Sequence, residues 1–289
     1  MRKIYNFVSH KTHNMNLPFL RSAGIISLLL FSTEGHARTI ISTNTGKPIQ
    51  YASVGIVNRN LGTVTDSAGN FSLTIPREFV NDSLKISAIT YRPKVFAVKD
   101  LKNLPDTIGL EEDVIILSEI VVKPQKLEHK TAGRKSSGGF IYINVEGYKA
   151  AGQGLAVPLK VSKRAWIKSL GFTILEDKNT LSRMKFRVNV YEKDGDRYSL
   201  LASAGQLYFD YNRSDLKEGH FHYDFPEEIM LEKGEYYLEL EFLENFTDEV
   251  FVMKSRPMTG KTRYRYASQS GWETLPFGAT LYFEYDDLK

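Results

Sequence analysis

Residues 46–76, GKPIQYASVGIVNRNLGTVTDSAGNFSLTIP, decide how the first part of the chain folds. Two segments of this stretch alternate apolar residues with other residues, a period of two that is typical of half-buried antiparallel strands. The apolar faces consist of Ala52, Val54 and Ile56 in the first segment and Phe71, Leu73 and Ile75 in the second. Between them, Gly69 and Asn70 tolerate the positive φ of a tight turn, and Pro76 ends the second segment. The stretch therefore predicts strands joined through a turn at residues 66–70.

The wider pattern is G-x-P-I-x-x-A-x-V, then G-T-V-T-D-x-x-G-N-F-x-L, then L-x-I-S-x-x-x-Y, and it resembles the carboxypeptidase regulatory-like domain. The residues that carry the match are Gly46, Pro48, Ile49, Ala52, Val54, Gly62, Thr63, Val64, Thr65, Asp66, Gly69, Asn70, Phe71, Leu73, Leu84, Ile86, Ser87 and Tyr91. The resemblance covers residues 38–112. It implies a seven-stranded, transthyretin-like β-sandwich of a kind abundant in exported proteins of the Bacteroidetes, without a zinc site or enzymatic activity. Where the family often has glycine before the tyrosine, this chain has Thr90.

The N-terminal residues 1–37 have the features of a secretory signal peptide. A basic start precedes an apolar run within residues 17–31, and Gly35-His36-Ala37 offers the small residues of a cleavage site. About ten strongly apolar residues are too few to span a bilayer, so we expect export and no membrane span after cleavage. The long basic start also makes Met15 an alternative initiation site to Met1.

Cysteine usage and charge narrow the class of protein further. The chain has no cysteine, which excludes a lipoprotein anchor and disulfide bonds but is compatible with the periplasm or an outer-membrane-associated, cell-surface location. The formal net charge is +4, and residues 1–37 contribute three of these units. Because the predicted mature chain is nearly neutral, nucleic acid is not an expected partner.

The predicted mature chain divides into three parts. Residues 38–112 form the regulatory-like domain. Residues 113–135 begin with an extended strand, L-S-E-I-V-V, and continue as the polar, basic segment KPQKLEHKTAGRK, which we interpret as a flexible linker. Residues 136–289 form a C-terminal domain, similar to uncharacterised domains paired with regulatory-like domains in the Bacteroidetes.

The sequence of the C-terminal domain predicts a succession of strands. Alternating segments occur at residues 140–145, 170–174, 186–190, 236–242, 251–253 and 281–285, and Asp194-Gly195-Asp196 marks a hairpin. No segment has a convincing helical period, so about eight to ten strands predict a β-sandwich resembling a jelly roll. The fold expected for the whole mature chain is therefore all-β.

One candidate metal site involves three residues on one strand. His220, His222 and Asp224 alternate with Phe221, Tyr223 and Phe225, so a zinc ion could be bound if a further ligand converged on the histidines. The interpretation we prefer is that the aromatic residues fill the core while the polar residues face water. A metal-dependent enzyme that uses His220 and His222 remains the weakest alternative function.

Paired carboxylates are a second candidate for catalysis. Glu239, Glu241 and Glu244 could serve glycoside hydrolysis. On an alternating strand such residues usually form the solvated face, and that is the structure we expect here.

Aromatic side chains give the best indication of a binding function. The chain has 16 Tyr and 17 Phe. If the protein binds glycans, Trp166, Tyr264, Tyr266 and Trp272 are the candidates for stacking against sugar rings. The alternative is that these rings fill the sandwich core, where aromatic residues are also favoured.

Taken together, the sequence predicts a non-catalytic, exported cell-envelope protein that acts as a structural or protein-interaction module. A carbohydrate-binding module of the envelope is the alternative. The partner is expected to be an envelope protein or a glycan, and no cofactor, catalytic residue or metal ligand is assigned. Short D-[ST]-apolar motifs at Asp66, Asp82 and Asp106 are also compatible with O-glycosylation.

Overall fold

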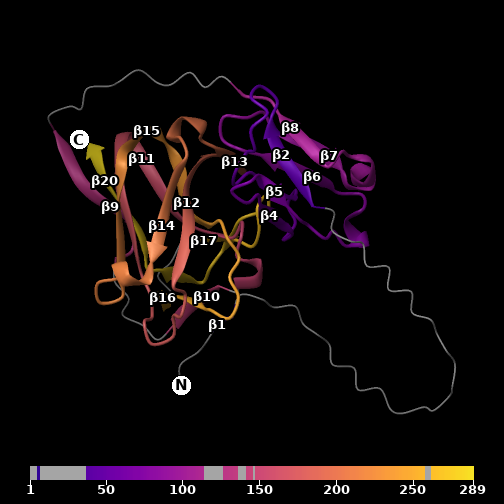
Figure 1. Cartoon of the computed structure of the whole chain (residues 1–289). Coiled ribbons are helices and arrows are strands. Elements are labelled where there is room, and N and C mark those ends of the chain that lie inside the picture. The colour runs from indigo at the N-terminus through magenta and orange to yellow at the C-terminus, as the bar shows by residue number, and fades with distance from the viewer. Residues whose placement is uncertain (1–4, 7–36, 114–125, 136–140, 146, 258–261) are drawn as a thin grey trace, which may run out of the picture.

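The computed structural model describes residues 5–6, 37–113, 126–135, 141–145, 147–257 and 262–289 (Figure 1). In these ranges the chain forms two β-sandwiches, which we call the first sandwich (residues 37–113) and the second sandwich (the described residues from 126 onward). The predicted all-β fold is confirmed. The helices are short 3-10 turns: η1 (Arg77–Phe79), η2 (Val98–Asn103), η3 (Gly147–Lys149), η4 (Ala202–Ala204) and η5 (Arg213–Asp215). In the described part of the chain, no helix has the length and hydropathy that a membrane span requires.

The first sandwich has seven strands in two sheets, as the family resemblance implies. The strands are β2 (Arg38–Ser42), β3 (Ser53–Ile56), β4 (Gly62–Val64), β5 (Asn70–Phe71), β6 (Ser83–Ser87), β7 (Lys94–Ala97) and β8 (Thr107–Leu110). One sheet has the order β5-β2-β8 and the other β4-β3-β6-β7. All neighbouring pairs are antiparallel except β2 and β8, which run parallel.

The turn at residues 66–70 forms as predicted. Asp66 closes it twice, since its backbone N–H donates to the Asn70 carbonyl at 2.8 Å and its carboxylate accepts from the Asn70 N–H at 2.8 Å. Gly69 has a φ of 77°, the left-handed conformation that glycine adopts without strain. The strand after the turn is shorter than predicted, because β5 ends at Phe71.

The predicted apolar face becomes the core of the first sandwich. Ala52, Val54 and Ile56 are fully buried, and Phe71 beside them is 7% exposed. Leu73 and Ile75 pack against this group while remaining partly exposed. All four residues of β3 are buried, however, including Ser53 and Gly55 on its other face. A second surface must therefore cover β3 from outside its own sandwich.

Thr90 occupies the position where the family often has glycine. Its φ is 71°, in the left-handed region that a β-branched residue rarely adopts. The family preference for glycine is thus a backbone requirement, which this chain meets at a cost in strain.

The second sandwich pairs one large sheet with a small one. Its strands are β9 (Leu127–Gly133), β10 (Ile141–Val145), β11 (Gly154–Thr173), β12 (Arg183–Asp194), β13 (Arg197–Leu200), β14 (Leu207–Asn212), β15 (His220–Phe242), β16 (Phe251–Pro257), β17 (Arg263–Arg265), β18 (Glu273–Thr274), β19 (Phe277–Ala279) and β20 (Leu281–Leu288). Each segment predicted as a strand in the C-terminal domain overlaps one of these strands, and the hairpin at Gly195 joins β12 to β13.

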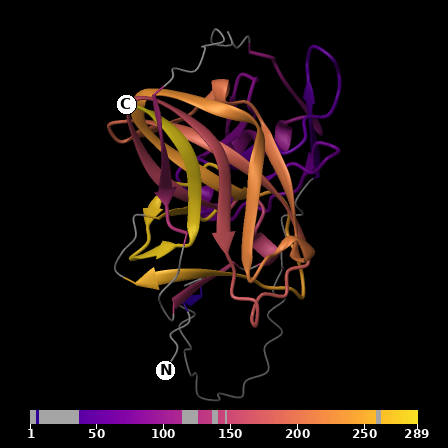
Figure 2. The same ribbon diagram turned by 90° about the vertical axis from the view of Figure 1, so that its left-hand side faces the viewer.

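The large sheet is built around β11 and β15, which pair antiparallel over almost their whole length. β12 pairs with the outer edge of β15 and is itself flanked by β13 and β14. β17 and β20 pair with the outer edge of β11, and β9 lies beyond β20. The pairing of β11 with β15 shifts register between Val161 and Arg164 and again between Ile167 and Ser169. Such irregularities increase local twist and bend, and the sheet curls around its core (Figure 2).

The small sheet has the order β1-β10-β16-β19, where β1 (Tyr5–Asn6) pairs parallel to β10. Between the sheets lies an aromatic core centred on Phe172, Phe186, Phe242 and Phe251. The ring centroids of Phe186 and Phe242 are 4.9 Å apart, and those of Phe242 and Phe251 are 5.2 Å apart. These rings close the space between the two sheets.

The segment predicted as a linker is in part a strand. Residues 127–133 form β9 along the edge of β20, with Lys130 bonded to Asp287 at 2.6 Å and His129 to Asp286 at 3.2 Å. The polar composition reflects an edge strand with one exposed face, so the flexible-linker interpretation is wrong for these residues. Three predicted features lie outside the described residues: the signal peptide except for residues 5–6 and 37, the strand at residues 114–122, and residues 136–140 at the start of the C-terminal domain.

Candidate functional site

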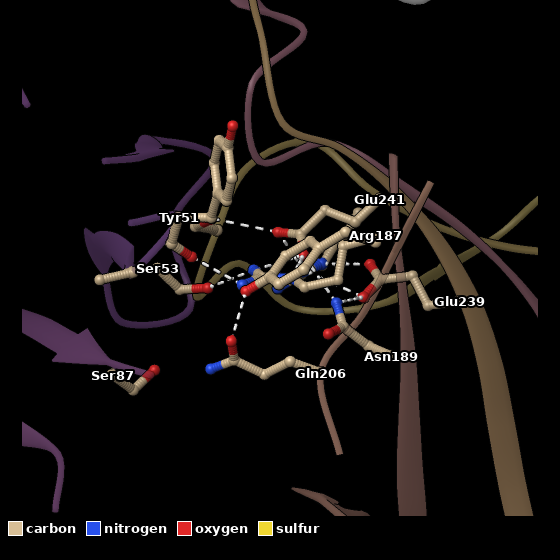
Figure 3. A network of polar contacts seen from close by, with 12 residues as sticks. Tyr51, Ser53, Ser87, Arg187, Asn189, Gln206, Glu239 and Glu241 are labelled. Carbon is tan, nitrogen blue, oxygen red and sulfur yellow. Dashed lines mark hydrogen bonds and ion pairs between the residues drawn. The ribbon is translucent and has the colours of Figure 1, made fainter. Parts of the chain in front are cut away.

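The outer face of β3 is covered by the second sandwich, and this contact contains the most unusual chemistry in the structure. Residues 51–64 and 87–89 of the first sandwich meet β12, β15 and the segment around residues 265–272 of the second (Figure 1). A group of buried charged side chains lies where they meet (Figure 3). We call Arg187, Asn189, Glu239, Glu241 and Arg265 the buried ionic cluster.

The strand register brings the cluster together. Along β12 and β15, Arg187 lies opposite Glu241 and Asn189 lies opposite Glu239. Directly opposed side chains on one face of an antiparallel pair are close neighbours. The same alternation sends Leu238, Leu240 and Phe242 into the aromatic core, so the polar series shares a single face that points toward the first sandwich.

Arg187 connects the two sandwiches. Its guanidinium donates to Glu241 Oε2 from Nε at 2.8 Å and from Nη2 at 2.6 Å. The same group donates to the Tyr51 carbonyl oxygen at 2.6 Å and to Ser53 Oγ at 3.1 Å (Figure 3). With Arg187 only 4% exposed and Glu241 fully buried, the charge is shielded from water. These charge-assisted hydrogen bonds join β12 directly to the backbone before β3.

Arg265 neutralises the second carboxylate. It donates to Glu239 from Nε at 2.6 Å and from Nη2 at 3.0 Å, and its Nη2 lies 2.8 Å from Glu241 Oε1. Asn189 Nδ2 bridges the two glutamates at 2.7 and 2.6 Å. Two arginines and two glutamates thus balance in charge, and each carboxylate is bound by at least two donor groups.

The two buried glutamates differ in proton affinity. Burial, together with the neighbouring Glu241, raises the pKa of Glu239 to about 7 against the attraction of Arg265. Burial would also raise the pKa of Glu241, but Arg187 and Arg265 together outweigh it and hold that pKa below its usual range. Glu239 is therefore the carboxylate that takes up a proton first as the pH falls.

Two glycines allow the sandwiches to approach closely. A Cβ on Gly55 would lie 2.0 Å from the backbone oxygen of Ser268, and one on Gly62 would lie 2.4 Å from the same atom. No other residue fits at either position without moving the backbone of the second sandwich. Gly62 belongs to the family motif, so one motif position also serves the contact between the sandwiches.

Further contacts surround the cluster. The Asn58 N–H donates to the Gln269 carbonyl at 3.0 Å, and the Gln269 side chain donates to Ser87 Oγ at 2.8 Å. An apolar group drawn from both sandwiches packs beside them and consists of Tyr51, Val64, Ala151 and Leu243, with Tyr208 against it. Tyr51, Asn58 and Gln269 all have positive φ, which is uncommon outside glycine. Strained backbone on both sides of the contact indicates that its geometry is closely determined.

The structure corrects the prediction for the glutamates. Glu239 and Glu241 are 0% exposed, so the expectation of a solvated face is wrong for both, while Glu244 is exposed as predicted. The alternation was read correctly, but the sequence did not show that a second sandwich covers the polar face. The matching series Arg187 and Asn189 on the neighbouring strand is the signal that could have revealed it.

The four candidate glycan-stacking rings divide into two groups. Trp166 is 4% exposed and Tyr264 is 0% exposed, so neither ring can stack against a sugar at the surface, and the proposal fails for both. Tyr264 instead donates its hydroxyl to Gln153. Tyr266 and Trp272 are partly exposed, and Trp272 lines an open pocket.

The histidines are engaged in local contacts. His220 Nδ1 lies 3.0 Å from Thr173 Oγ1, and His222 lies between Tyr282 and Asp224 at 3.3 and 3.2 Å. Within the described ranges, no three His, Cys, Asp or Glu residues gather in a way that could hold a metal ion. Of the aromatic residues that alternate with this polar series, Phe221 and Phe225 are buried in the core, as the preferred interpretation predicts, and Tyr223 is partly buried against it.

Comparison with known families finds a match that includes most of the first sandwich. Residues 39–122 match the family model of the CarboxypepD_reg-like domain. The TonB-dependent receptor SusC of Bacteroides thetaiotaomicron is 33% identical over 101 residues, which are 35% of this chain. The chain thus spans only 9% of the length of that curated relative.

Solved structures similar to the whole chain are remote. The structure of infectious bursal disease virus Gt strain is 10% identical, with a TM-score of 0.30, covering 87% of this chain and 58% of that one. The structure of the Gx strain of the same virus is also 10% identical, with a TM-score of 0.26, covering 82% and 62%. At such TM-scores the match is too loose to assign a shared fold.

Proposed function

We propose that this protein is an exported, non-catalytic component of the cell envelope, in which the two sandwiches act as one rigid unit that binds a partner protein. The observation that carries the proposal is the buried ionic cluster, through which Arg187 of the second sandwich binds the backbone at Tyr51 of the first. The CarboxypepD_reg-like match and the similarity to the TonB-dependent receptor SusC support the envelope location.

The cluster favours one arrangement of the sandwiches over others. In any other arrangement Arg187 would lose the Tyr51 carbonyl and Ser53, and the pair it forms with Glu241 would face water or an unmatched surface. A buried hydrogen-bonding group that loses its partner costs about 1–3 kcal/mol, and more where the group is charged. A unit held in this way presents the surfaces of both sandwiches to a partner in one fixed relative orientation.

The paired carboxylates support a structural role. Hydrolysis by two carboxylates requires one of them to give or take a proton at a substrate. Here Glu239 is bound by Arg265 and Asn189, and Glu241 by both arginines and Asn189, with neither exposed to solvent. Their chemistry is used to join β12, β15 and β17.

Strand addition at β7 is the mode of partner binding that the fold favours. β7 ends the four-stranded sheet of the first sandwich, and no strand in the described part of the chain pairs with its outer edge. Val95 on this strand is 58% exposed. An extended segment of a partner protein can add to such an edge through backbone hydrogen bonds, with Val95 as an apolar contact.

The test combines capture with a matched pair of variants. The wild-type protein, Val95→Lys and Val80→Lys are incubated with envelope extract of the native host, and bound proteins are identified by mass spectrometry. Val80 is 43% exposed but lies outside β7, so it controls for the added charge. We expect one envelope protein to be retained by the wild type and Val80→Lys and lost with Val95→Lys. Equal capture by all three, or none by the wild type, would refute binding at β7.

Rigidity is tested separately by NMR. Residual dipolar couplings from the two sandwiches should fit one alignment tensor. Two different tensors would show that the sandwiches move independently, whatever the partner.

A further inference from the structure

An open pocket of about 320 Å³ lies at the edge of the contact between the sandwiches. Its lining consists of Asn58, Arg59 and Asn60 from the turn between β3 and β4, and Gly271, Trp272 and Glu273 from the segment that enters β18. The volume is at the lower end of the range for small-molecule sites, and contacts between domains are a frequent place for them. Both walls are present only because the sandwiches are joined.

The Trp272 ring is fixed before any ligand arrives. It contacts the rings of Tyr191 and Tyr237 edge to face, with centroids 5.6 and 5.8 Å away. The guanidinium of Arg265 lies 5.6 Å from its centroid. Arg265 belongs to the buried ionic cluster and is bound by Glu239 and Glu241, so one neighbour of the ring is held by several buried polar contacts. A preorganised aromatic wall lowers the entropy cost of binding.

The opposite wall is fixed as well. The Asn58 backbone donates across the contact to Gln269, and its φ of 57° sets the direction of the turn. Arg59 is held by Asp82 at 3.1 and 3.2 Å and lies over the ring of Phe79. The turn therefore presents the side chains of residues 58 and 60 from a fixed backbone.

The polar groups of the pocket indicate the charge of its ligand. Asn58, Asn60 and Glu273 are exposed, and among the described residues their side chains form no hydrogen bond or ion pair. Because Arg59 is neutralised by Asp82, the uncompensated charge is the carboxylate of Glu273, which opposes an anionic ligand. The pocket therefore disfavours an anionic ligand, and two amides with one carboxylate suit hydroxyl groups as donors and acceptors.

We propose that this pocket binds a neutral saccharide, with one sugar ring against Trp272 and its hydroxyl groups hydrogen bonded to Asn58, Asn60 and Glu273. A pyranose combines an apolar C–H surface with a rim of hydroxyls, and an aromatic side chain flanked by polar groups complements both. This function goes beyond binding of a partner protein and does not depend on it. The site requires only that the two sandwiches stay joined.

The test is a titration of the wild-type protein followed by ¹H–¹⁵N NMR and tryptophan fluorescence. The probes are glucose, galactose, mannose, N-acetylglucosamine and their short oligomers, up to tens of millimolar. We expect saturable shifts confined to residues 58–60 and 271–273 with at least one probe. Trp272→Ala should weaken binding about tenfold or more and Asn60→Ala several-fold, as expected for loss of a stacking contact and of a hydrogen bond.

Two controls keep the result interpretable. Tyr148→Ala removes an exposed aromatic ring outside the pocket and should leave the affinity unchanged. The amide signals of Asn58 and Gln269 report whether each variant keeps the sandwiches joined, and Asn60→Ala leaves the contacts of the Trp272 ring intact. Absence of saturable shifts with every probe would overturn the proposal. So would binding that survives both Trp272→Ala and Asn60→Ala, or binding of an aromatic compound such as adenosine in place of any sugar.

Discussion

Replacement of Arg187 by methionine should break the contact between the sandwiches. Methionine keeps the length of the side chain but removes its donors to Glu241, the Tyr51 carbonyl and Ser53. Glu241 would keep Arg265 and Asn189, so it is not left without partners. It would nevertheless be a fully buried carboxylate in a cluster with one net negative charge.

The expected cost is about 3 kcal/mol, at the low end of the range for removing one partner of a buried pair. The assay is urea unfolding followed by tryptophan fluorescence, because Trp166 and Trp272 both lie in the second sandwich. Arg164→Met is the matched control. Arg164 also forms two bonds to one glutamate, at 2.9 and 2.6 Å, but its partner Glu232 is 58% exposed. An exposed pair contributes about 0–1 kcal/mol.

A double variant tests the reasoning further. Arg187→Met combined with Glu241→Leu removes both charges of the pair, so it should be more stable than Arg187→Met alone by about 1 kcal/mol or more. Two results would refute the argument: a cost for Arg187→Met no larger than for Arg164→Met, or no recovery in the double variant. Either would mean that burial of the Arg187–Glu241 pair does not make it more important for stability than an exposed pair.

Three further predictions follow from the same region and its surroundings. Gly62→Ala should separate the sandwiches, because its Cβ would lie 2.4 Å from the Ser268 carbonyl oxygen. Hydrogen exchange at residues 55–62 should rise in this variant, whereas Gly271→Ala, with open space around it, should leave exchange there unchanged. Raising the pH from about 4.5 to about 7 should destabilise the wild type by up to about 3 kcal/mol relative to Glu239→Gln, because the raised folded-state pKa of Glu239 adds stability at low pH that is lost through this window. Equal pH profiles of stability for the two proteins would contradict this. Thr90→Gly should raise the free energy of unfolding by about 1 kcal/mol by relieving left-handed strain, and a lower melting temperature would count against this.

The local pattern of the sequence predicted most of the fold. Turn chemistry at Gly69 and the alternation around Val54 were sufficient for the strands beside the turn, because both depend on neighbours within a few residues. The seven-stranded sandwich itself was implied by the family resemblance. Prediction from the sequence failed where contacts between distant segments determine the structure. β9 was missed because an exposed edge strand is polar on one face and short of apolar alternation, so its composition resembles that of a linker.

The contact between the sandwiches was hidden for a related reason. Alternation on β15 shows that Glu239 and Glu241 share a face, but not what covers that face. Their partners Arg187 and Arg265 are separated from them by more than twenty residues, and only the strand register brings them together. The covering surface is the far side of β3, whose alternation was interpreted for its own core alone.

The place of β20 in the large sheet has a consequence for how this half of the chain reaches its native state. β20 lies between β11 and β9, so residues 281–288 fill a central position although they come after every other strand of the sandwich in sequence. Until they arrive, β11 and β9 each expose a row of unpaired backbone groups, which are sites for wrong pairing with other chains. Completion of the sheet therefore has to wait for synthesis of almost the whole domain. A product interrupted before Leu281 would be a substrate for aggregation or proteolysis rather than a smaller stable fold.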